Sequence, residues 1–483
     1  MAFPIDKNKE MLKWGPIDGR LIYPDYFTVA FALFPKAGYF SWPNLLGLFR
    51  KGKMTYIGDM EELRKKGGLN FKKYILPKKQ RTAHYTIWKK GVKKLLQIQK
   101  QITEPKLKKL TNKALFNLYD EWSKQYLTFW TVGALPELSG WGGEAMLKQN
   151  LEKSFSGETF VNIFEKLSAP EKLSFYQKAD LELYTLKKYR GETLEKKLKN
   201  HQQKYFWMLN SYSHSKILTV PCFKNQLTKI SSIQATKKAK ELTNLPKEVK
   251  KQKHQIVKKY RVNRRLLDLA RALAFGINWQ DERKYYIFLA NHIIDIFLKE
   301  IAKRYNLNFD SLHNYSHKDI HRLLKSGKIL PKTETKKRKL ALVTEYLKKT
   351  NSLKYLSGRP AKKIIGHYLK SARKKGTQAL TGIVVSKGPA VTGKVRIILS
   401  AKEAGKMKQG EILVTTMTSP DFIVAMKKAK GIVTDSGGIT SHAAIVSREL
   451  KIPCIVGTEY ATQTLKNGQK IRMDTRRGKI IRL

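Results

Sequence analysis

Residues 434–457, TDSGGITSHAAIVSRELKIPCIVG, decide the fold of the C-terminal part of the chain. The β-branched run at 431–434 predicts a buried strand that ends where this stretch begins. Residues 435–438 are turn formers, and a helix is predicted from about 442 to 450. A Pro ends that helix, and residues 454–457 read as the next strand. The stretch therefore predicts a strand, a glycine turn, a helix and a second strand.

One histidine, His442, falls in the first turn of the predicted helix. Thr440 or Ser441 can cap this helix, and Gly437 and Gly438 let the backbone take a positive φ and come close to a ligand. A helix start presents unpaired N–H groups and the positive end of the helix dipole, which favour a phosphate anion. An imidazole at this place can carry a phosphoryl group whose charge is partly compensated.

The alternative is that His442 only caps or packs the helix, as most single histidines do. The glycine turn, the two hydroxyls beside the histidine and the small pair Ala443–Ala444 behind it favour the chemical role.

The stretch resembles the phosphohistidine signature of the PEP-utilising enzymes, a family that includes PEP synthase, pyruvate phosphate dikinase and rifampicin phosphotransferase. That signature reads approximately T-D-x-G-G-x-[TL]-[SC]-H-[AG]-[AS]-[IV]-[VA]-x-R-E-x-x-I-P-x-[VI]-V-G. The chain matches it at Thr434, Asp435, Gly437, Gly438, Thr440, Ser441, His442, Ala443, Ala444, Ile445, Val446, Arg448, Glu449, Ile452, Pro453, Ile455, Val456 and Gly457.

The resemblance implies a function for several of these residues. His442 would be the catalytic phosphohistidine, with Thr440 and Ser441 hydrogen-bonded to the ring or the phosphate. Gly437 and Gly438 would form the phosphate-binding turn. Arg448 lies nearly two turns further on, so a structural ion pair is expected for it. In this family the histidine is carried on a small swivelling domain.

The rest of the last hundred residues agrees with such a domain. Strands are predicted at 382–386, 393–398 and 411–415, a short helix at 422–428 after the cap residues 418–421, and a closing hairpin at 468–474 and 479–482. We expect residues 379–483 to form a swivelling β/β/α phosphohistidine domain.

The region before it reads as mostly helical. The predicted helices lie at 81–102, 111–129, 144–155, 159–186, 192–210 and 262–305, the last broken at 276–278. Residues 134–143, ALPELSGWGG, read as a glycine loop, and the aromatic stripe from Phe116 to Trp130 reads as core. The fold class is thus multidomain, α plus α/β. A helical region at 1–375 has a possible break near 215–260, and a linker is predicted at about 331–378.

Length and composition limit the class of protein. The 483 residues, 41 % of them hydrophobic, allow two or three domains with cores of their own. The two cysteines, Cys222 and Cys454, indicate no disulfide framework. Without a basic-then-apolar leader or a long apolar run, the expected location is cytoplasmic, with no membrane contact.

The formal net charge of +58 would suit a nucleic-acid binder. The charge is spread evenly, however: the last 103 residues hold 18 Lys and Arg against 7 Asp and Glu. Residues 229–265 hold 13 Lys and Arg against 2 acids and could contact phosphates, but a solvated helix face is favoured. We interpret the charge as compositional bias, and nucleic acid is not the expected partner.

Three histidines, His313, His317 and His321, stand at the i, i+4, i+8 spacing of a metal site. Ser316 reads as a helix start, which places His313 in the preceding turn, and no acidic or Cys set completes a site. No metal is expected to bind.

Full enzymes of the family need a nucleotide-binding ATP-grasp part and often a PEP barrel, and neither pattern is found in these residues. The main hypothesis is a phosphotransferase (kinase- or dikinase-like) subunit, incomplete on its own. An ATP-grasp partner would supply ATP and Mg²⁺ in trans, and the acceptor would be an unidentified small molecule. The alternatives are a binding or regulatory protein that keeps the swivelling fold, and a basic nucleic-acid binder.

Overall fold

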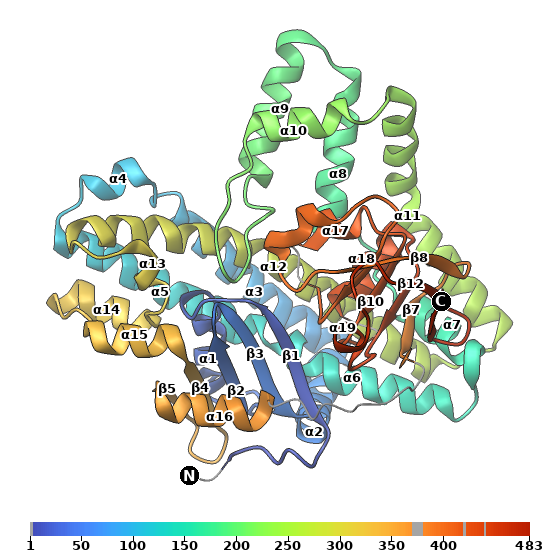
Figure 1. The fold of residues 1–483 in the computed structure, drawn as a ribbon, viewed down its shortest axis with the longest axis horizontal. Helices are drawn as coiled ribbons and strands as arrows, with labels where there is room; N and C mark the ends of the chain where they lie inside the picture. Colours follow the sequence, from blue (N-terminus) through green and yellow to red (C-terminus); the bar gives the residue numbers. More distant parts are fainter. Residues whose placement is uncertain (1–2, 370–379, 419–421, 439–440) are drawn as a thin grey trace.

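The computed structural model describes residues 3–369, 380–418, 422–438 and 441–483. It joins a large, mainly helical region to a C-terminal region rich in strands (Figure 1). In Figure 1 the C-terminal sheet lies beside the N-terminal sheet, and α8, α9 and α10 project above both. The prediction of a helical region followed by a strand-rich C-terminal region is thus confirmed at this coarse level, whereas the boundary at 379 stays a prediction.

The N-terminal region contains an antiparallel sheet that the sequence analysis missed. Its strand order is β1-β3-β2-β4-β5, and the last two strands come from far along the chain. Its strands are β1 (Met11–Asp18), β2 (Leu45–Arg50), β3 (Lys53–Asp59), β4 (Leu342–Leu347) and β5 (Ser352–Ser357). The long separation between β2 and β4 hides their pairing from any local pattern.

The helices of this region pack around the sheet and around one another. They are α1 (Ile22–Leu33), α2 (Met60–Asn70), α3 (Lys78–Gln99), α4 (Glu104–Lys108), α5 (Asn112–Gly133), α6 (Leu135–Glu152), α7 (Gly157–Ser168), α8 (Phe175–Thr185), α9 (Gly191–Tyr205), α10 (Val220–Thr228), α11 (Ser232–Lys259), α12 (Arg264–Arg304), α13 (Phe309–Leu312), α14 (His317–Ser326), α15 (Lys332–Leu340) and α16 (Arg359–Leu369). Short 3₁₀ or π turns are η1 (Pro35–Ala37), η2 (Phe71–Ile75), η3 (Leu186–Lys188) and η4 (Ala401–Lys406).

The C-terminal region is built on a mixed sheet with the order β6-β13-β12-β8-β9-β10-β11-β7. The central strands β8 to β11 run parallel, and the outer strands pair antiparallel. The strands are β6 (Leu380–Thr381), β7 (Ile383–Ser386), β8 (Val391–Ile397), β9 (Ile412–Thr415), β10 (Gly431–Thr434), β11 (Cys454–Val456), β12 (Lys470–Asp474) and β13 (Lys479–Arg482). The helices are α17 (Ile423–Met426), α18 (His442–Leu450) and α19 (Ala461–Thr464). The predicted strands and the closing hairpin are confirmed. The predicted cap residues 419–421 lie outside the described residues.

The prediction of a glycine loop at 134–143 is wrong, because these residues lie at the start of the continuous helix α6. Its glycines serve close packing against α2. A β-carbon on Gly142 would lie 1.9 Å from the Gly68 nitrogen, and one on Gly143 would lie 2.5 Å from the Phe71 ring. Glycine is required here by a helix contact and not by a turn.

Three other boundaries also differ from the prediction. The helix α12 runs unbroken through Gly276, and the predicted helix at 159–186 is two helices, α7 and α8. The predicted linker at 331–378 contains α15, β4, β5 and α16, while residues 370–379 lie outside the described part. Buried apolar side chains such as Val343 of β4 and Ile364 of α16 hold part of this segment in place, which its basic composition concealed.

The main apolar core runs from α1 and the aromatic stripe of α5 to the C-terminal helices α17 and α18. Tyr119, Trp122, Tyr126 and Trp130 are at most 3 % exposed, so the prediction that the stripe is core is confirmed. The C-terminal region has a second core inside its sheet, including Val395, Val433 and Ile455. Among the described residues, every helix is too short or too polar to cross a bilayer.

Candidate functional site

The predicted strand, turn and helix around His442 are present. The parallel strands β10 and β11 are joined by α18, which begins at His442 and is capped by Ser441, whose Oγ accepts from the Ala444 N–H at 3.3 Å. The helix ends at Lys451 in the left-handed conformation (φ 55°). His442 thus lies outside the carboxyl ends of the parallel strands, where α/β sheets bind ligands.

The two ring nitrogens of His442 have different surroundings. The Nδ1 atom lies 2.8 Å from the Thr418 hydroxyl, which follows the neighbouring strand β9. The Nε2 atom is buried, and no described residue makes a hydrogen bond to it. A buried nitrogen without a partner at a helix start is the exception that calls for a functional explanation.

Burial lowers the pKa of His442 well below its usual value, and the ammonium group of Lys284 acts in the same direction. The imidazole is therefore neutral at physiological pH. When Nδ1 carries the proton and donates it to Thr418 Oγ1, the lone pair on Nε2 is free to attack an electrophile.

Two charged groups of the helical region lie near this motif, and the sequence analysis named neither as a site residue. Lys284 lies on α12, and a β-carbon on Gly438 would be 3.6 Å from Glu144 Oε1 on α6. Glu449 of α18 is hydrogen-bonded to Ser174, and burial raises its pKa to about 8. No local motif links Lys284 or Glu144 to His442, because the fold brings them together from segments far apart in the sequence.

The other predicted site residues fall as follows. Gly437 has a φ of 125°, and a β-carbon there would lie 3.0 Å from Ser441 Oγ, so the turn needs glycine at this position. Gly438 follows Gly437 and lies close to the Glu144 side chain. Thr440 lies outside the described residues. Arg448 donates from Nε to the Ala444 carbonyl at 2.8 Å. The negative charges of Glu165 and Glu144 attract its guanidinium group.

Asp435 of the motif has a structural role in this arrangement. Its carboxylate accepts from the Thr462 N–H at 2.9 Å and from the Thr462 hydroxyl. It thereby ties the turn after β10 to the start of α19. Burial raises the pKa of Asp435 to about 6.

The three histidines at metal-like spacing face three different carboxylates. His313 Nε2 lies 3.4 Å from Asp295, His317 Nδ1 lies 2.6 Å from Asp25, and His321 Nε2 lies 3.1 Å from Asp120. Within the described ranges no group of three His, Cys, Asp or Glu side chains is arranged to hold a metal ion. These histidines instead tie α14 and the segment before it to α1, α5 and α12.

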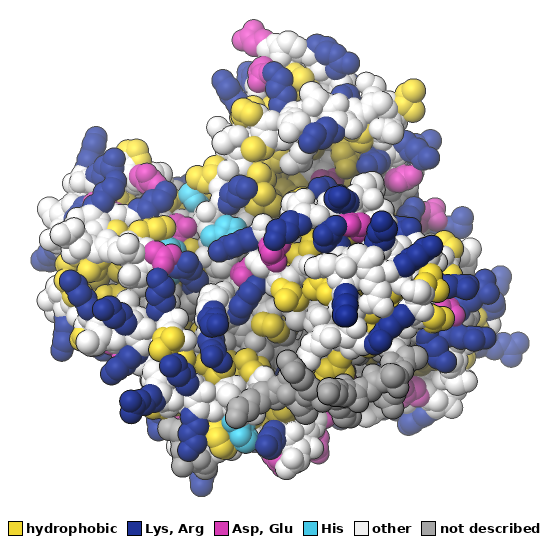
Figure 2. Space-filling view, in the orientation of Figure 1, with side chains coloured by type: hydrophobic (Ala, Val, Ile, Leu, Met, Phe, Trp, Pro, Cys, Tyr) yellow, Lys and Arg dark blue, Asp and Glu magenta, His cyan; other side chains and the backbone are white. Residues whose placement is uncertain are grey.

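Lysine and arginine side chains are spread over the whole face shown in Figure 2 and are mixed with uncharged and acidic groups. Helix α11, which holds most of the basic stretch predicted at 229–265, is largely exposed. Both observations favour the interpretation of the charge as a general surface property over that of a single binding stripe.

Comparison with known proteins supports the family resemblance for the C-terminal region. Residues 407–478 match the family model described as "PEP-utilising enzyme, mobile domain". A probable phosphoenolpyruvate synthase of Archaeoglobus fulgidus is 52 % identical over 108 residues, which are 22 % of this chain and 14 % of the relative. The phosphoenolpyruvate synthase of Pyrococcus furiosus is 57 % identical over 99 residues, which are 20 % of this chain and 12 % of the relative.

The chain thus covers less than a sixth of the length of each of these relatives, and the family match at 407–478 includes the helix that begins with His442. The motif, the β10–α18–β11 unit and the family match agree with one another. Over residues 407–478 the chain is thus similar to the mobile domain of the PEP-utilising enzymes.

Proposed function

We propose that this chain is a phosphoryl-transfer component that carries a phosphoryl group on Nε2 of His442. An ATP-grasp partner, acting in trans with ATP and Mg²⁺, supplies the group, and a small molecule bound by the helical region receives it. The observation that carries the proposal is the buried Nε2 atom, unpartnered among the described residues, on a neutral imidazole whose other nitrogen faces Thr418.

The chemistry needs little beyond positioning and charge neutralisation. In the charging step an Nε2–P bond forms while a P–O bond of the donor breaks. Nδ1 keeps its proton, which it donates in a hydrogen bond to Thr418 Oγ1. The start of α18 and the ammonium group of Lys284 compensate the negative charge of the phosphoryl group.

Charging requires movement, because Nε2 is buried in the present arrangement. Besides the apolar core that it shares with the helical region, the C-terminal region is held by individual polar contacts. Lys427 Nζ lies 2.9 Å from Asp180, Lys53 Nζ lies 2.7 Å from the Leu399 carbonyl, and Thr416 Oγ1 lies 3.0 Å from the Pro16 carbonyl. Such contacts are each worth about 1 kcal/mol or less, so they allow the domain to dock and release.

The test uses the purified full chain mixed with labelled ATP and Mg²⁺, alone and with each candidate ATP-grasp protein from the same genome. We expect acid-labile, alkali-stable label on the protein in one of the mixtures. His442→Asn removes the proposed acceptor nitrogen. Ser447→Ala is the matched control in the same helix, and it reports any loss of labelling that comes from general damage to α18.

Label that appears in the wild type and in Ser447→Ala but not in His442→Asn supports the proposal. If no mixture labels the protein, or if His442→Asn is labelled as strongly as the wild type, the proposal is wrong. Transfer of label from β- rather than γ-labelled ATP would identify the donor chemistry as dikinase-like.

A further inference from the structure

Helix α18 turns two titratable side chains toward the helical region. Glu449 stands seven residues after His442, which is close to two full turns, so both lie on the same side of the helix. On α12, Lys284 acts on His442. Asp281, one turn earlier on the same helix, acts on Glu449. The contact that buries Nε2 of His442 therefore includes Glu449 as well.

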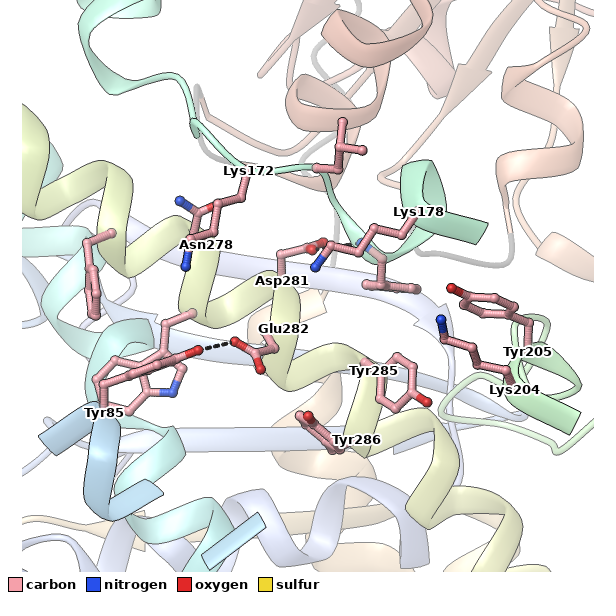
Figure 3. Close-up of a pocket in the computed structure, with 14 residues that line it drawn as sticks. Tyr85, Lys172, Lys178, Lys204, Tyr205, Asn278, Asp281, Glu282, Tyr285 and Tyr286 are labelled. Carbon is pink, nitrogen blue, oxygen red and sulfur yellow. Dashed lines mark hydrogen bonds between the residues drawn. The ribbon is translucent and has the colours of Figure 1, made fainter. Parts of the chain in front are cut away.

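The Glu449 carboxyl group meets a short segment of the helical region. It accepts a hydrogen bond from the hydroxyl of Ser174, a buried residue that caps α8. The next residue, Phe175, donates its backbone N–H to Asp281 at 3.1 Å. Figure 3 shows Asp281 on α12, facing the segment that leads into α8. Two carboxyl groups, one from each region, are thus held by adjacent residues.

The charged groups that face these two carboxyl groups come from α8, α12, α18 and the end of α17. The acids that oppose ionisation of Glu449 are Asp281 on α12 and Asp180 on α8. The cations that face it are Arg448 on α18, Lys284 on α12 and Lys427 after α17. Asp281 itself faces Lys284, Lys178 and Glu282.

None of these cations neutralises either carboxyl group directly. Among the described residues, neither Glu449 nor Asp281 forms an ion pair, and Lys427 Nζ is paired with Asp180 at 2.9 Å. A carboxylate that is withdrawn from water and has no paired cation is unfavourable, so the neutral acid is favoured. Burial accordingly raises the pKa of Glu449 to about 8 and the pKa of Asp281 to about 6.

We propose that Glu449 is a latch, which in its protonated form holds the C-terminal region on the helical region and on losing its proton to the solvent releases it. Because His442 lies on the same face of α18, release also uncovers Nε2. The latch itself does not depend on phosphoryl transfer, whereas its consequence for transfer rests on the proposed function.

The pH dependence of docking follows from the two states of Glu449. The pKa of this group is about 8 when docked, and after release it returns toward its usual value of about 4.5. The docked state therefore binds more protons between these values, and docking weakens as the pH rises through them. Asp281 titrates below this window's upper part, at about pH 6. His442 opposes the effect only below its usual pKa of about 6.5, so the range from pH 6.5 to 8 isolates Glu449.

The experiment measures release in the full chain as the rate at which diethyl pyrocarbonate modifies His442, followed by mass spectrometry. The reagent needs an uncovered, neutral imidazole. His254, which is exposed on α11, is the internal reference, and the ratio of the two rates cancels the effect of pH on the reagent. We expect this ratio to rise about tenfold between pH 6.5 and pH 8. A ratio that is constant or falls overturns the proposal without the use of any variant.

Three variants locate the effect. Glu449→Gln stays neutral, so its ratio should remain at the value for pH 6.5. Asp281→Asn removes a charge that opposes ionisation of Glu449, and its ratio should rise less than in the wild type. Glu411→Gln is the matched control, because Glu411 pairs with Arg396 at 2.6 Å inside the C-terminal region, and its ratio should rise as in the wild type. A wild-type rise in Glu449→Gln or Asp281→Asn, or no rise in Glu411→Gln, overturns the latch.

This measurement is separate from the test of the proposed function, because the reagent modifies His442 without any phosphoryl donor. A pH-independent ratio in a protein that becomes phosphorylated on His442 overturns the latch alone. The expected rise in a protein that no donor phosphorylates supports the latch and overturns the proposed function.

Discussion

At the scale of single residues, the site depends on how one imidazole is held. Thr418 contacts Nδ1 from one strand end, and the charge of Lys284 in the helical region acts on the ring. The tautomer with the proton on Nδ1 is the reactive one, because only an unprotonated Nε2 can attack phosphorus. The hydroxyl of Thr418 can accept the hydrogen bond that this tautomer donates.

Replacement of Thr418 by Val removes the hydroxyl and keeps the shape of the side chain. We expect the initial rate of His442 phosphorylation to fall about tenfold or more, because the ring loses the hydrogen bond that orients it. The rate is measured from acid-labile label at limiting donor. Thr418→Ser restores a hydroxyl and should recover most of it; equal rates for the Val variant and the wild type would contradict the assignment.

Glu449 and Glu411 give opposite dependences of stability on pH. Burial raises the pKa of Glu449 to about 8, so ionisation of this group in the folded state costs free energy as the pH rises from about 4.5 to 8. At pH 9, Glu449→Gln should therefore raise the melting temperature and increase the free energy of unfolding by about 1 kcal/mol. At pH 4.5 the substitution should change the stability little.

Glu411 is the matched control, because a hydrogen-bonded ion pair with Arg396 (2.6 Å) holds the pKa of this carboxyl below its usual value. Its contribution to stability is present above about pH 4.5 and is lost as the pH falls through the lowered pKa. Glu411→Gln should thus lower the melting temperature at pH 7. The same sign for both variants at pH 9 would show that burial does not govern Glu449.

At the scale of elements, α2 and α6 are in contact through glycines. A β-carbon on Gly67 would lie 2.3 Å from the Leu138 carbonyl oxygen, and one on Gly142 would lie 1.9 Å from the Gly68 nitrogen. The two helix backbones therefore touch directly. Helix α6 also packs on α12, and Glu144 of α6 faces the glycine turn at Gly438, so this contact positions part of the site.

The substitution Gly142→Ala should destabilise the protein by about 3 kcal/mol, because backbone atoms on both sides prevent relaxation. Gly276→Ala is the control: Gly276 lies in the middle of α12, and a β-carbon there meets no atom within 4 Å. It should stabilise the protein by about 1 kcal/mol through helix propensity. Both values come from chemical denaturation, and similar effects from the two changes would contradict the packing account.

Local signals explain which elements the sequence could predict. The strands β7 to β13 and the helix α18 follow from alternating or β-branched runs bounded by glycine and proline, and α18 begins and ends within a residue of its prediction. The N-terminal sheet was missed because β2 pairs with β4 almost three hundred residues later. The glycines of α6 and Gly276 of α12 resembled breaks, since glycine for packing and glycine for a turn look alike in sequence.

The candidate site likewise contains residues that local sequence could predict and residues that it could not. His442, Ser441 and Gly437 follow from the motif, because they are neighbours in the chain. Thr418 and Lys284 could not be predicted, since the first depends on the pairing of β9 with β10 and the second on docking between two regions.

At the scale of the whole molecule, the C-terminal region is docked with its histidine facing inward. Part of its apolar surface, including Phe422, Ala443 and Val446, belongs to the same core cluster as the helical region. The contacts around that surface are a small set of ion pairs and hydrogen bonds. Docking therefore combines an apolar contact with individual ion pairs and hydrogen bonds.

The titration of His442 reports on this docking. Lys284→Met removes a positive charge that faces the ring, so the pKa of His442 should rise, while remaining below its usual value because burial is the larger cause. Lys284→Arg keeps the charge and should leave the titration nearly unchanged. The measurement is an NMR titration of the His442 Cε1–H signal; an identical curve for Lys284→Met and the wild type would place Lys284 away from the ring in solution.

The central claim is that His442 carries a phosphoryl group on Nε2. The most direct measurement is ¹H–¹⁵N–³¹P NMR of the ¹⁵N-histidine-labelled full chain after it has been phosphorylated by its donor. The account predicts one phosphorylated histidine, at position 442, with phosphorus coupled to Nε2 and a proton on Nδ1. Phosphorus on Nδ1, on another residue, or on no residue of a protein that supports transfer would contradict it.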